Sequence, residues 1–519
     1  MYKLRYIFLC IVVASFISNA TAQKNHNRTF LSGNYAGFFA DSMNYNNVYV
    51  ERRDTGLHFS KKYYSYYDFF LSQTSTYCDS DGKPVMVWQG CYILDADSLS
   101  PIYKGDFSDS KGAKEPQFKF CSLRERTGNY RVINGYNLTY STFFLDRGDP
   151  HDILLVYYRY ENIPSADSFY LYTARIDLTG SPEGKPAVMY KDSLAAGPIN
   201  LKVGSIQAIR HANGLDWHIV FAENYSSNFY SVLFDREGTH PVVKSVISQW
   251  GINTNNSGIS AVSPRGDIFA YLSQQENKFI LLNFDRCSGA FSFLAQDSFP
   301  IIEEGNLWIR FAEFSPSGHY YYITTASNLY QFDLKDPSLH NSLTHIASFD
   351  TAQVNQFPIP LPIKGYFGQM FRGYDGHMYM WSGNAVPLIH RIEFPDRKGP
   401  DVGFKQDFRK LPFYPPWFIN TLVDYELGAL PGDPCHTATK DLPPEKITLY
   451  PNPTSNRIKS NLSYDYDGLK LSIIDATGRR VYAGSCGDLR SGIDVQSLPS
   501  GMYLVLIQGR EVGKFAKVN

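Results

Sequence analysis

The chain has 519 residues, 43% hydrophobic and 15% aromatic, and its 49 Lys and Arg against 50 Asp and Glu leave a net charge of −1. This length exceeds what one hydrophobic core usually serves, so several domains or a repeat array are expected. The balanced charge argues against nucleic acid or an anionic membrane as a partner, and the abundance of Tyr and Phe favours an all-β protein.

Residues 1–22 have the pattern of a secretory signal peptide. Lys3 and Arg5 precede an apolar run, and Ala20-Thr21-Ala22 supplies the small residues of a cleavage site. No later stretch approaches the roughly 20 apolar residues that a membrane span needs. We therefore expect an exported mature chain that begins at Gln23 and has no transmembrane segment.

A unit of one turn and two apolar strands recurs along the chain. The turns at 263–266 and 315–318 both read Ser-Pro-x-Gly, and their glycines, Gly266 and Gly318, lie 52 residues apart. Ser at the first position, Pro at the second and Gly at the fourth suit a type I turn. Weaker copies are marked by four more glycines: Gly82, Gly148, Gly214 and Gly376.

Repeats of this length built from short strands are typical of β-propeller blades, which need neighbours to bury their faces. The six marked units, with the unmarked residues near the N-terminus, predict about seven blades over residues 23–436, with six as the alternative. The unmarked segment would form the seventh blade alone or share it with the strands after Phe404.

Six cysteines remain in the exported chain, which is few for its length, and no C-x-x-C pair is present. Cys78 and Cys91 flank the turn-forming pair Asp81-Gly82. A hairpin at that turn predicts a Cys78–Cys91 disulfide, with Cys121 as the alternative partner.

A different domain follows a proline-dense stretch. Proline has no backbone N–H to donate within a β-sheet, and prolines are dense between residues 430 and 444. We therefore place a linker at 437–446. Residues 447–519 then alternate about seven short apolar runs with turns at Gly478, Gly492 and Gly501. This pattern predicts a compact, Ig-like β-sandwich.

This tail resembles the type A sorting domain of the type IX secretion system of Bacteroidota. Four blocks carry the resemblance: 450–454 (Tyr-Pro-Asn-Pro-Thr), 471–479, 498–503 (Leu-Pro-Ser-Gly-Met-Tyr) and 514–517. It implies Sec export to the periplasm, passage through the outer-membrane translocon, and removal of the tail by a sortase-like peptidase, with the cargo left on the cell surface or in the medium. The sorting-signal residues that it implies are Tyr450, Pro451, Asn452, Pro453, Gly478, Leu498, Pro499, Gly501, Tyr503 and Lys514.

The cargo, roughly residues 30–435, is similar to Bacteroidota surface and gliding-associated propeller proteins. Turn and strand motifs carry this likeness, among them Tyr77-Cys78-Asp79 with Gly82, residues 314–318 and residues 374–379. Such motifs imply a fold and no particular activity.

None of the common catalytic or nucleotide-binding motifs occurs in the chain. His211 and His218 lie near Asp216, and His377 lies near Asp375, but a zinc site needs three such side chains to converge. We therefore expect no metal, cofactor or catalytic residue, and favour a binding or adhesion module for an unknown glycan, peptide or protein. The alternative is a secreted polysaccharide hydrolase or lyase with its site on the propeller face.

Overall fold

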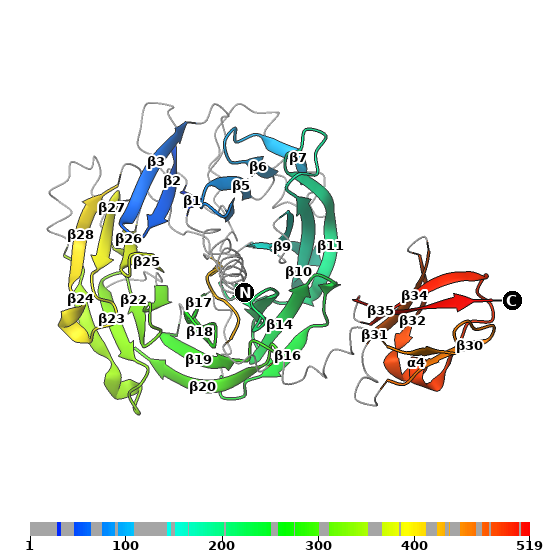
Figure 1. The fold of residues 1–519 in the computed structure, drawn as a ribbon. Helices are drawn as coiled ribbons and strands as arrows, with labels where there is room; N and C mark the ends of the chain where they lie inside the picture. The colour runs from blue at the N-terminus through cyan, green and yellow to red at the C-terminus, as the bar shows by residue number, and fades with distance from the viewer. Residues whose placement is uncertain are drawn as a thin grey trace, which may run out of the picture. The chain divides into compact units, whose positions relative to one another are not determined.

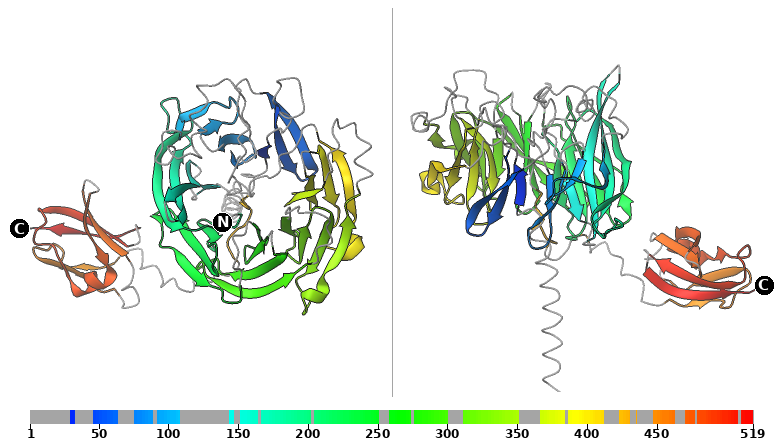
Figure 2. Two further views of the ribbon diagram at one scale, coloured as in Figure 1. Left: turned by 180° about the vertical axis from the view of Figure 1, so that it is seen from behind. Right: turned by 90° about the horizontal axis from the view of Figure 1, so that it is seen from above.

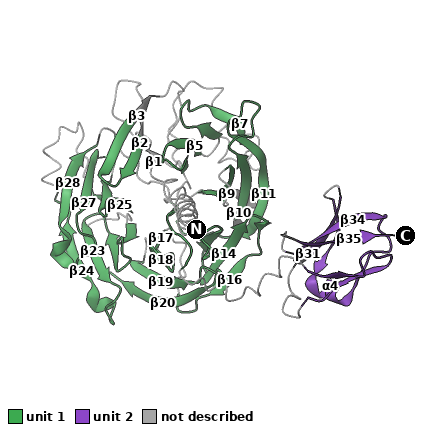
Figure 3. Cartoon of the chain, viewed as in Figure 1, with its two compact units in different colours: residues 1–430 green, residues 431–519 purple. Residues whose placement is uncertain are grey.

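The computed structural model describes the following residues: 29–32, 46–63, 75–88, 92–107, 143–146, 151–163, 166–201, 204–250, 258–273, 276–299, 311–350, 366–383, 386–411, 423–430, 435, 447–462, 470–476, 479–507 and 510–518. The chain divides into two compact units, residues 1–430 and 431–519 (Figure 3). The expected signal peptide lies outside the described residues. Among those that are described, no helix is long and apolar enough to cross a membrane.

In the described residues of unit 1, seven groups of strands, each antiparallel within itself, stand around a ring, and the second and third groups are joined in one sheet (Figures 1 and 2). The first group is β1 (Thr29–Ser32), β2 (Asn46–Arg53) and β3 (Gly56–Tyr63). The second is β4 (Ser75–Cys78), β5 (Pro84–Trp88), β6 (Tyr92–Asp95) and β7 (Pro101–Asp106). The third is β8 (Phe143–Asp146), β9 (Asp152–Ile163), β10 (Ala166–Asp177) and β11 (Ala187–Ile199).

The remaining groups complete the ring. The fourth is β12 (Gln207–Arg210), β13 (Trp217–Ala222), β14 (Asn228–Asp235), β15 (Gly238–Thr239) and β16 (Val243–Val246). The fifth is β17 (Gly258–Val262), β18 (Ile268–Ser273), β19 (Lys278–Phe284) and β20 (Phe291–Ser298). The sixth is β21 (Phe311–Phe314), β22 (Tyr320–Thr324), β23 (Asn328–Asp333), the 3-10 turn η3 (His340–Ser342) and β24 (Thr344–Ser348). The seventh is β25 (Phe367–Arg372), β26 (Met378–Ser382), β27 (Leu388–Ile392), the 3-10 turn η4 (Gly399–Val402) and β28 (Phe404–Lys410).

The Ser-Pro-x-Gly turns connect the first two strands of the fifth and sixth blades. The Gly266 and Gly318 N–H groups each donate a 2.8 Å hydrogen bond to the carbonyl oxygen of the turn serine, Ser263 or Ser315. Both glycines have a positive φ, 70° and 72°, which glycine adopts without a steric cost. Gly82, Gly214 and Gly376 occupy the same place in their blades with φ of 80°, 74° and 80°, whereas Gly148 lies outside the described residues.

Aromatic and aliphatic side chains fill the spaces between neighbouring blades. Between the fifth and sixth, for example, the rings of Phe279 and Phe332 lie 4.8 Å apart. The ring closes where Val50 and Leu57 of the first sheet pack against Tyr379 and its neighbours in the last. The strand that starts at Phe404 pairs with β27, so it completes the last blade and is not shared with the first.

Residues 423–430 run inside the ring and not along its edge (Figure 1). The Tyr425 side chain packs against Trp217, and its hydroxyl donates a hydrogen bond to the Phe144 carbonyl oxygen. Further along, the Leu430 N–H donates to the Ala212 carbonyl oxygen at 2.9 Å. This segment, called the axial segment below, therefore touches the third and fourth blades, which lie far from it in the sequence.

Unit 2 contains two small sheets, as predicted for the tail. One holds β29 (Leu449–Tyr450), β30 (Arg457–Ser460) and β33 (Ile493–Asp494), and the other holds β32 (Arg480–Ser485), β31 (Lys470–Asp475), β34 (Gly501–Ile507) and β35 (Arg510–Lys517). The helix α4 (Cys486–Ser491) was not expected. It begins with a capping box of Ser485 and Asp488, and it buries Cys486 and Leu489 in the core.

Candidate functional site

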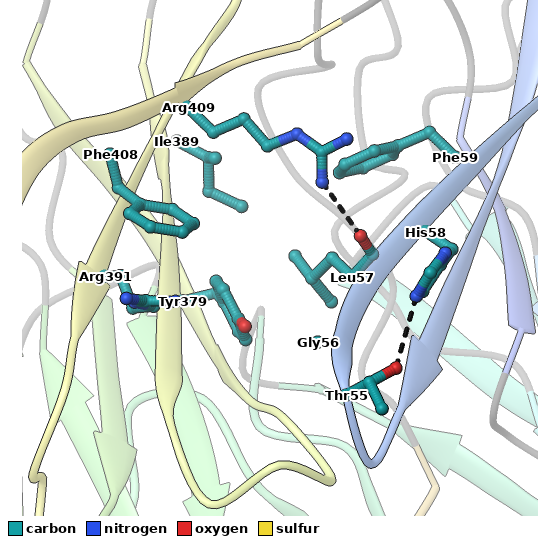
Figure 4. Close-up of a pocket in the computed structure, with 10 residues that line it drawn as sticks. All are labelled: Thr55, Gly56, Leu57, His58, Phe59, Tyr379, Ile389, Arg391, Phe408 and Arg409. Carbon is teal, nitrogen blue, oxygen red and sulfur yellow. Dashed lines mark hydrogen bonds between the residues drawn. The ribbon is translucent and has the colours of Figure 1, made fainter.

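A pocket of about 210 Å³ opens between the first and last sheets of the ring (Figure 4). The β2–β3 hairpin forms one wall, and β26, β27 and β28 form the other. Ring closure thus brings together side chains about 350 positions apart in the chain. The lining residues are Thr55, Gly56, Leu57, His58, Phe59, Tyr379, Ile389, Arg391, Phe408 and Arg409. We call this the seam pocket.

The floor of the seam pocket is buried and its rim is exposed. Tyr379 is 2% exposed, and its hydroxyl donates a 2.6 Å hydrogen bond to Asp375 Oδ2. Burial, followed by the contact with Asp375, raises the pKa of Tyr379 well above its usual range. On the rim, Thr55 Oγ1 lies 3.3 Å from His58 Nε2 (Figure 4). The tyrosine therefore stays neutral, and the rim offers small polar groups.

Cations dominate the side of the pocket formed by the last blade. Arg391 and Lys405 both pair with the Glu393 carboxylate, through Arg391 Nε at 2.7 Å and Lys405 Nζ at 2.8 Å. The Arg391 guanidinium also stacks on the Phe408 ring, 3.6 Å from its centre. Arg409 donates instead to the Leu57 carbonyl oxygen at 3.0 Å, across the seam. Arg391 and Lys405 thus share the Glu393 carboxylate while Arg409 pairs with no carboxylate among the described residues, which leaves this wall positively charged.

A second pocket, of about 560 Å³, lies over β23 and β24 and contains serine and histidine side chains. Ser348 Oγ and Asn328 Oδ1 each lie 3.1 Å from His345 Nε2. Because an amide oxygen only accepts hydrogen bonds, Nε2 carries the ring proton here. In this arrangement His345 cannot take a proton from Ser348, as a hydrolase of the serine–histidine type requires.

A largely buried carboxyl group, that of Glu313, lies beside the axial segment. Arg372 Nε is 3.7 Å from Glu313 Oε1, and Arg372 Nη2 is 3.7 Å from Asp424 Oδ2. Burial raises the pKa of Glu313, while Arg372 and the Phe314 N–H partly oppose that rise. A raised carboxyl pKa is the property that a general acid needs.

The histidines considered as metal ligands serve the fold. His211 Nε2 donates to the Cys287 carbonyl oxygen at 3.2 Å while its Nδ1 accepts from the Asn213 N–H, and His377 Nδ1 donates to the Glu393 carbonyl oxygen. His218 Nε2 donates to the Arg286 carbonyl oxygen at 3.1 Å. Within the described ranges, no three His, Cys, Asp or Glu side chains are grouped as a metal site.

The Cys78–Cys91 disulfide stays a prediction. Cys78 is buried, and Cys91 lies outside the described residues. Cys78 ends β4 beside the β4–β5 turn, whereas Trp88, the last residue of β5 before Cys91, pairs with Ser75 at the other end of the hairpin. Cys287 and Cys435 are the described cysteines that are disulfide-bonded.

The described sorting-signal residues of unit 2 lie on β34, on β35 and in segments that contact these two strands. Asn452 Nδ2 donates to the Lys514 carbonyl oxygen at 3.0 Å, and the Ala516 N–H donates to Asn452 Oδ1 at 2.9 Å. These two bonds dock the turn of Tyr450, Pro451, Asn452 and Pro453 on β35.

A second set of bonds joins the other blocks. The Tyr503 hydroxyl donates to the Pro499 carbonyl oxygen at 2.8 Å, just after Leu498, and its ring stacks on Phe515 at 5.4 Å. Gly501, at the start of β34, pairs with Lys517. Gly478 lies outside the described residues. Asp475 of the 471–479 block pairs with Tyr503 where β31 lies beside β34. The structure thus brings all four sequence blocks into contact.

Sequence reasoning missed the seam pocket and the axial segment. The pocket residues sit on strands that read only as repeat elements, and just the pair Phe408-Arg409, an exposed aromatic and an exposed cation on an outer strand, hinted at a surface role. The axial segment follows a proline-rich run and has no periodicity that would indicate its place.

Comparison with known families identifies the tail. Residues 448–518 match the family described as "Secretion system C-terminal sorting domain". A comparison with curated proteins finds no match.

Several solved structures are similar to the chain. A protein from Lactobacillus plantarum is 10% identical, with 76% of this chain and 98% of that chain covered and a TM-score of 0.39. A putative 6-phosphogluconolactonase from Bacteroides fragilis is 8% identical, with coverage of 74% and 95% and a TM-score of 0.34. A periplasmic gluconolactonase from Pseudomonas aeruginosa is 13% identical, with coverage of 73% and 88% and a TM-score of 0.30. Likeness at this level carries no information on activity.

The matched region coincides with the two small sheets of unit 2 and contains every predicted sorting-signal residue. Residues 448–518 form a sorting domain, and the chain is a propeller cargo of the type IX secretion system that is exported to the cell surface or the extracellular space.

Proposed function

We propose that the propeller is a non-catalytic module that binds a glycan, peptide or protein outside the cell. The observation that carries this proposal is the convergence of Arg391 and Arg409 with aromatic rings in the seam pocket. Guanidinium groups remain protonated at physiological pH, so they hold anions without exchanging protons. Charged and aromatic groups around an open pocket are the means by which proteins recognise ligands.

The alternative is a polysaccharide hydrolase or lyase. Glu313 favours it, because a carboxyl with a raised pKa beside Arg372 is suited to donate a proton. In that case the active site would lie beside the axial segment and not at the seam.

An array of glycans and proteins, run beside a panel of polysaccharide substrates, separates the two functions. Protein containing residues 23–519 is expected to retain a ligand on the array and to release no product. Product formation that is lost in Glu313→Gln but kept in Arg409→Gln would establish the enzyme instead.

We also propose that the tail engages the type IX translocon and is removed by a sortase-like peptidase, which leaves a propeller of residues 23–436. The contacts of Asn452 and Tyr503 support this, because they join the separate blocks into one surface. Deletion of 447–519 is expected to trap a folded propeller in the periplasm, and mass spectrometry of surface protein is expected to show no tail.

A further inference from the structure

We propose that the seam pocket binds the carboxylate-bearing sugar residue of an acidic glycan, with Arg409 as the group that pairs with the carboxylate. This inference rests on the proposed binding function and names the ligand class and the site. Its basis is the charge, the size and the wall chemistry of the pocket.

The charge of the pocket indicates an anion. Arg391 is already occupied, since Glu393 accepts from its Nε and its Nη2. Arg409 differs: in the part of the chain that the structure describes it makes no ion pair, and one of its five N–H donors is used by the Leu57 carbonyl oxygen. An exposed guanidinium with donors to spare can bind a carboxylate through two parallel hydrogen bonds.

The neighbouring acids limit the charge of that anion. Glu393 lies on the same wall, and Asp375 Oδ2 reaches the floor, where it would be 3.5 Å from a Cβ added at Gly56. A carboxylate with one negative charge meets less repulsion from these two groups than a doubly charged phosphate does. The pocket is therefore matched to a single carboxylate.

The size and the rim indicate a sugar ring. At about 30 Å³ per water, a cavity of about 210 Å³ has room for roughly seven waters, less than a drug-sized ligand needs. Thr55 and His58 on the rim can bond hydroxyl groups, while the Phe408 and Phe59 rings offer apolar surface (Figure 4). A sugar ring that carries both hydroxyls and a carboxylate can bond the rim groups and Arg409 at once, while its carbon faces contact the aromatic rings.

Binding is tested by calorimetry on protein containing residues 23–519 at low ionic strength. D-galacturonate and D-glucuronate are the probes, and glucose and succinate are the comparison ligands. We expect a uronate to bind, glucose to bind at least tenfold more weakly, and 0.5 M NaCl to weaken the uronate, since exposed ion pairs are screened. Arg409→Gln is expected to weaken uronate binding at least tenfold, and Arg409→Lys less.

Arg265→Gln is the matched control, since the Arg265 side chain is 76% exposed in the β17–β18 turn and, among the described residues, its ion-pair partner is the nearby Asp267. If Arg409→Gln fails to fold, because the bond to Leu57 is lost, Arg409→Lys and His58→Ala carry the test. Succinate that binds as well as the uronates would overturn the sugar assignment. A protein that retains a glycan on the array but binds uronate equally in wild type and Arg409→Gln would overturn this site while leaving the binding module intact, whereas an empty array would remove the binding module itself.

Discussion

The Arg286 guanidinium donates a 2.6 Å hydrogen bond to the carbonyl oxygen of Gly428, which lies 142 positions later in the chain. Its other donors reach the carbonyl oxygens of Arg210, His211 and Arg265. Burial lowers the pKa of Arg286 to about 10, so the group stays charged at neutral pH. One buried cation thus ties the axial segment to the turns of the fourth and fifth blades.

Arg286→Ala is expected to lower the free energy of unfolding by about 3 kcal/mol, because one buried and three partly buried carbonyl groups lose a charged donor. The measurement is urea-induced unfolding followed by tryptophan fluorescence. Arg265→Ala, which removes an exposed side chain from the neighbouring turn, should change stability by less than about 0.5 kcal/mol. Equal effects of the two substitutions would show that the axial segment is not held by Arg286.

Two turn glycines give a second test of the axial segment. Gly214 and Gly376 have similar positive φ values, 74° and 80°, so alanine strains both backbones by about 1–2 kcal/mol. A Cβ at Gly214 would lie 2.6 Å from the Ala429 nitrogen, whereas one at Gly376 would meet nothing within 4 Å. Gly214→Ala should therefore cost about 2 kcal/mol more than Gly376→Ala in chemical unfolding. Matching losses would contradict the docking of Ala429.

Acid should weaken the propeller through two buried histidines. Burial lowers the pKa of His390 to about 3, and burial followed by His211 lowers that of His218 to about 3. Both would titrate near 6.5 in the unfolded chain. The unfolded chain then binds more protons between these values, so stability is complete above pH 6.5 and falls as the pH drops towards 3.

Thermal unfolding at several pH values between 7 and 4 measures this loss. His390→Gln should make the midpoint less sensitive to pH, since it removes one titrating group and keeps an acceptor for the Asp407 N–H. His345→Gln, at an exposed position, should leave the pH dependence unchanged. If the unfolding midpoint of His390→Gln fell with pH as steeply as that of the wild type, other groups would cause the acid sensitivity.

Asn452→Ala should impair export. It removes two hydrogen bonds to β35, at a cost of about 2 kcal/mol to the small sorting domain. The amount of protein retained in the periplasm, compared with the surface and the medium, is the measurement. Asn456→Ala replaces an exposed asparagine of the same turn region, and its export should match the wild type. If both variants were exported equally, the Asn452 contacts would not matter for sorting.

Local signals in the sequence were enough to predict the blades and the sandwich. The turns at Gly266 and Gly318 place the strands around them, because a positive φ and a fixed proline specify the turn within four residues. The strands of the tail follow from short alternating runs in the same way. The helix α4 was missed although Ser485 and Asp488 have capping-box spacing, since the helix holds only six residues.

Features that depend on closure of the ring could not be predicted. The seam pocket exists because Leu57 and Arg409 meet across the gap between the first and last blades. The position of the axial segment likewise follows from long-range packing around Tyr425.

The second and third blades differ from the others because β7 and β11 pair in parallel, with Tyr103 opposite Ala187, and join both blades into one eight-stranded sheet. Amide hydrogens of the two blades should accordingly exchange with solvent as one cooperative unit, since opening either blade removes the pairing between β7 and β11 from the other. The blades with separate sheets can open one at a time, so slow, matched exchange in residues 84–106 and 187–199 would identify this joint as the part of the ring that opens last.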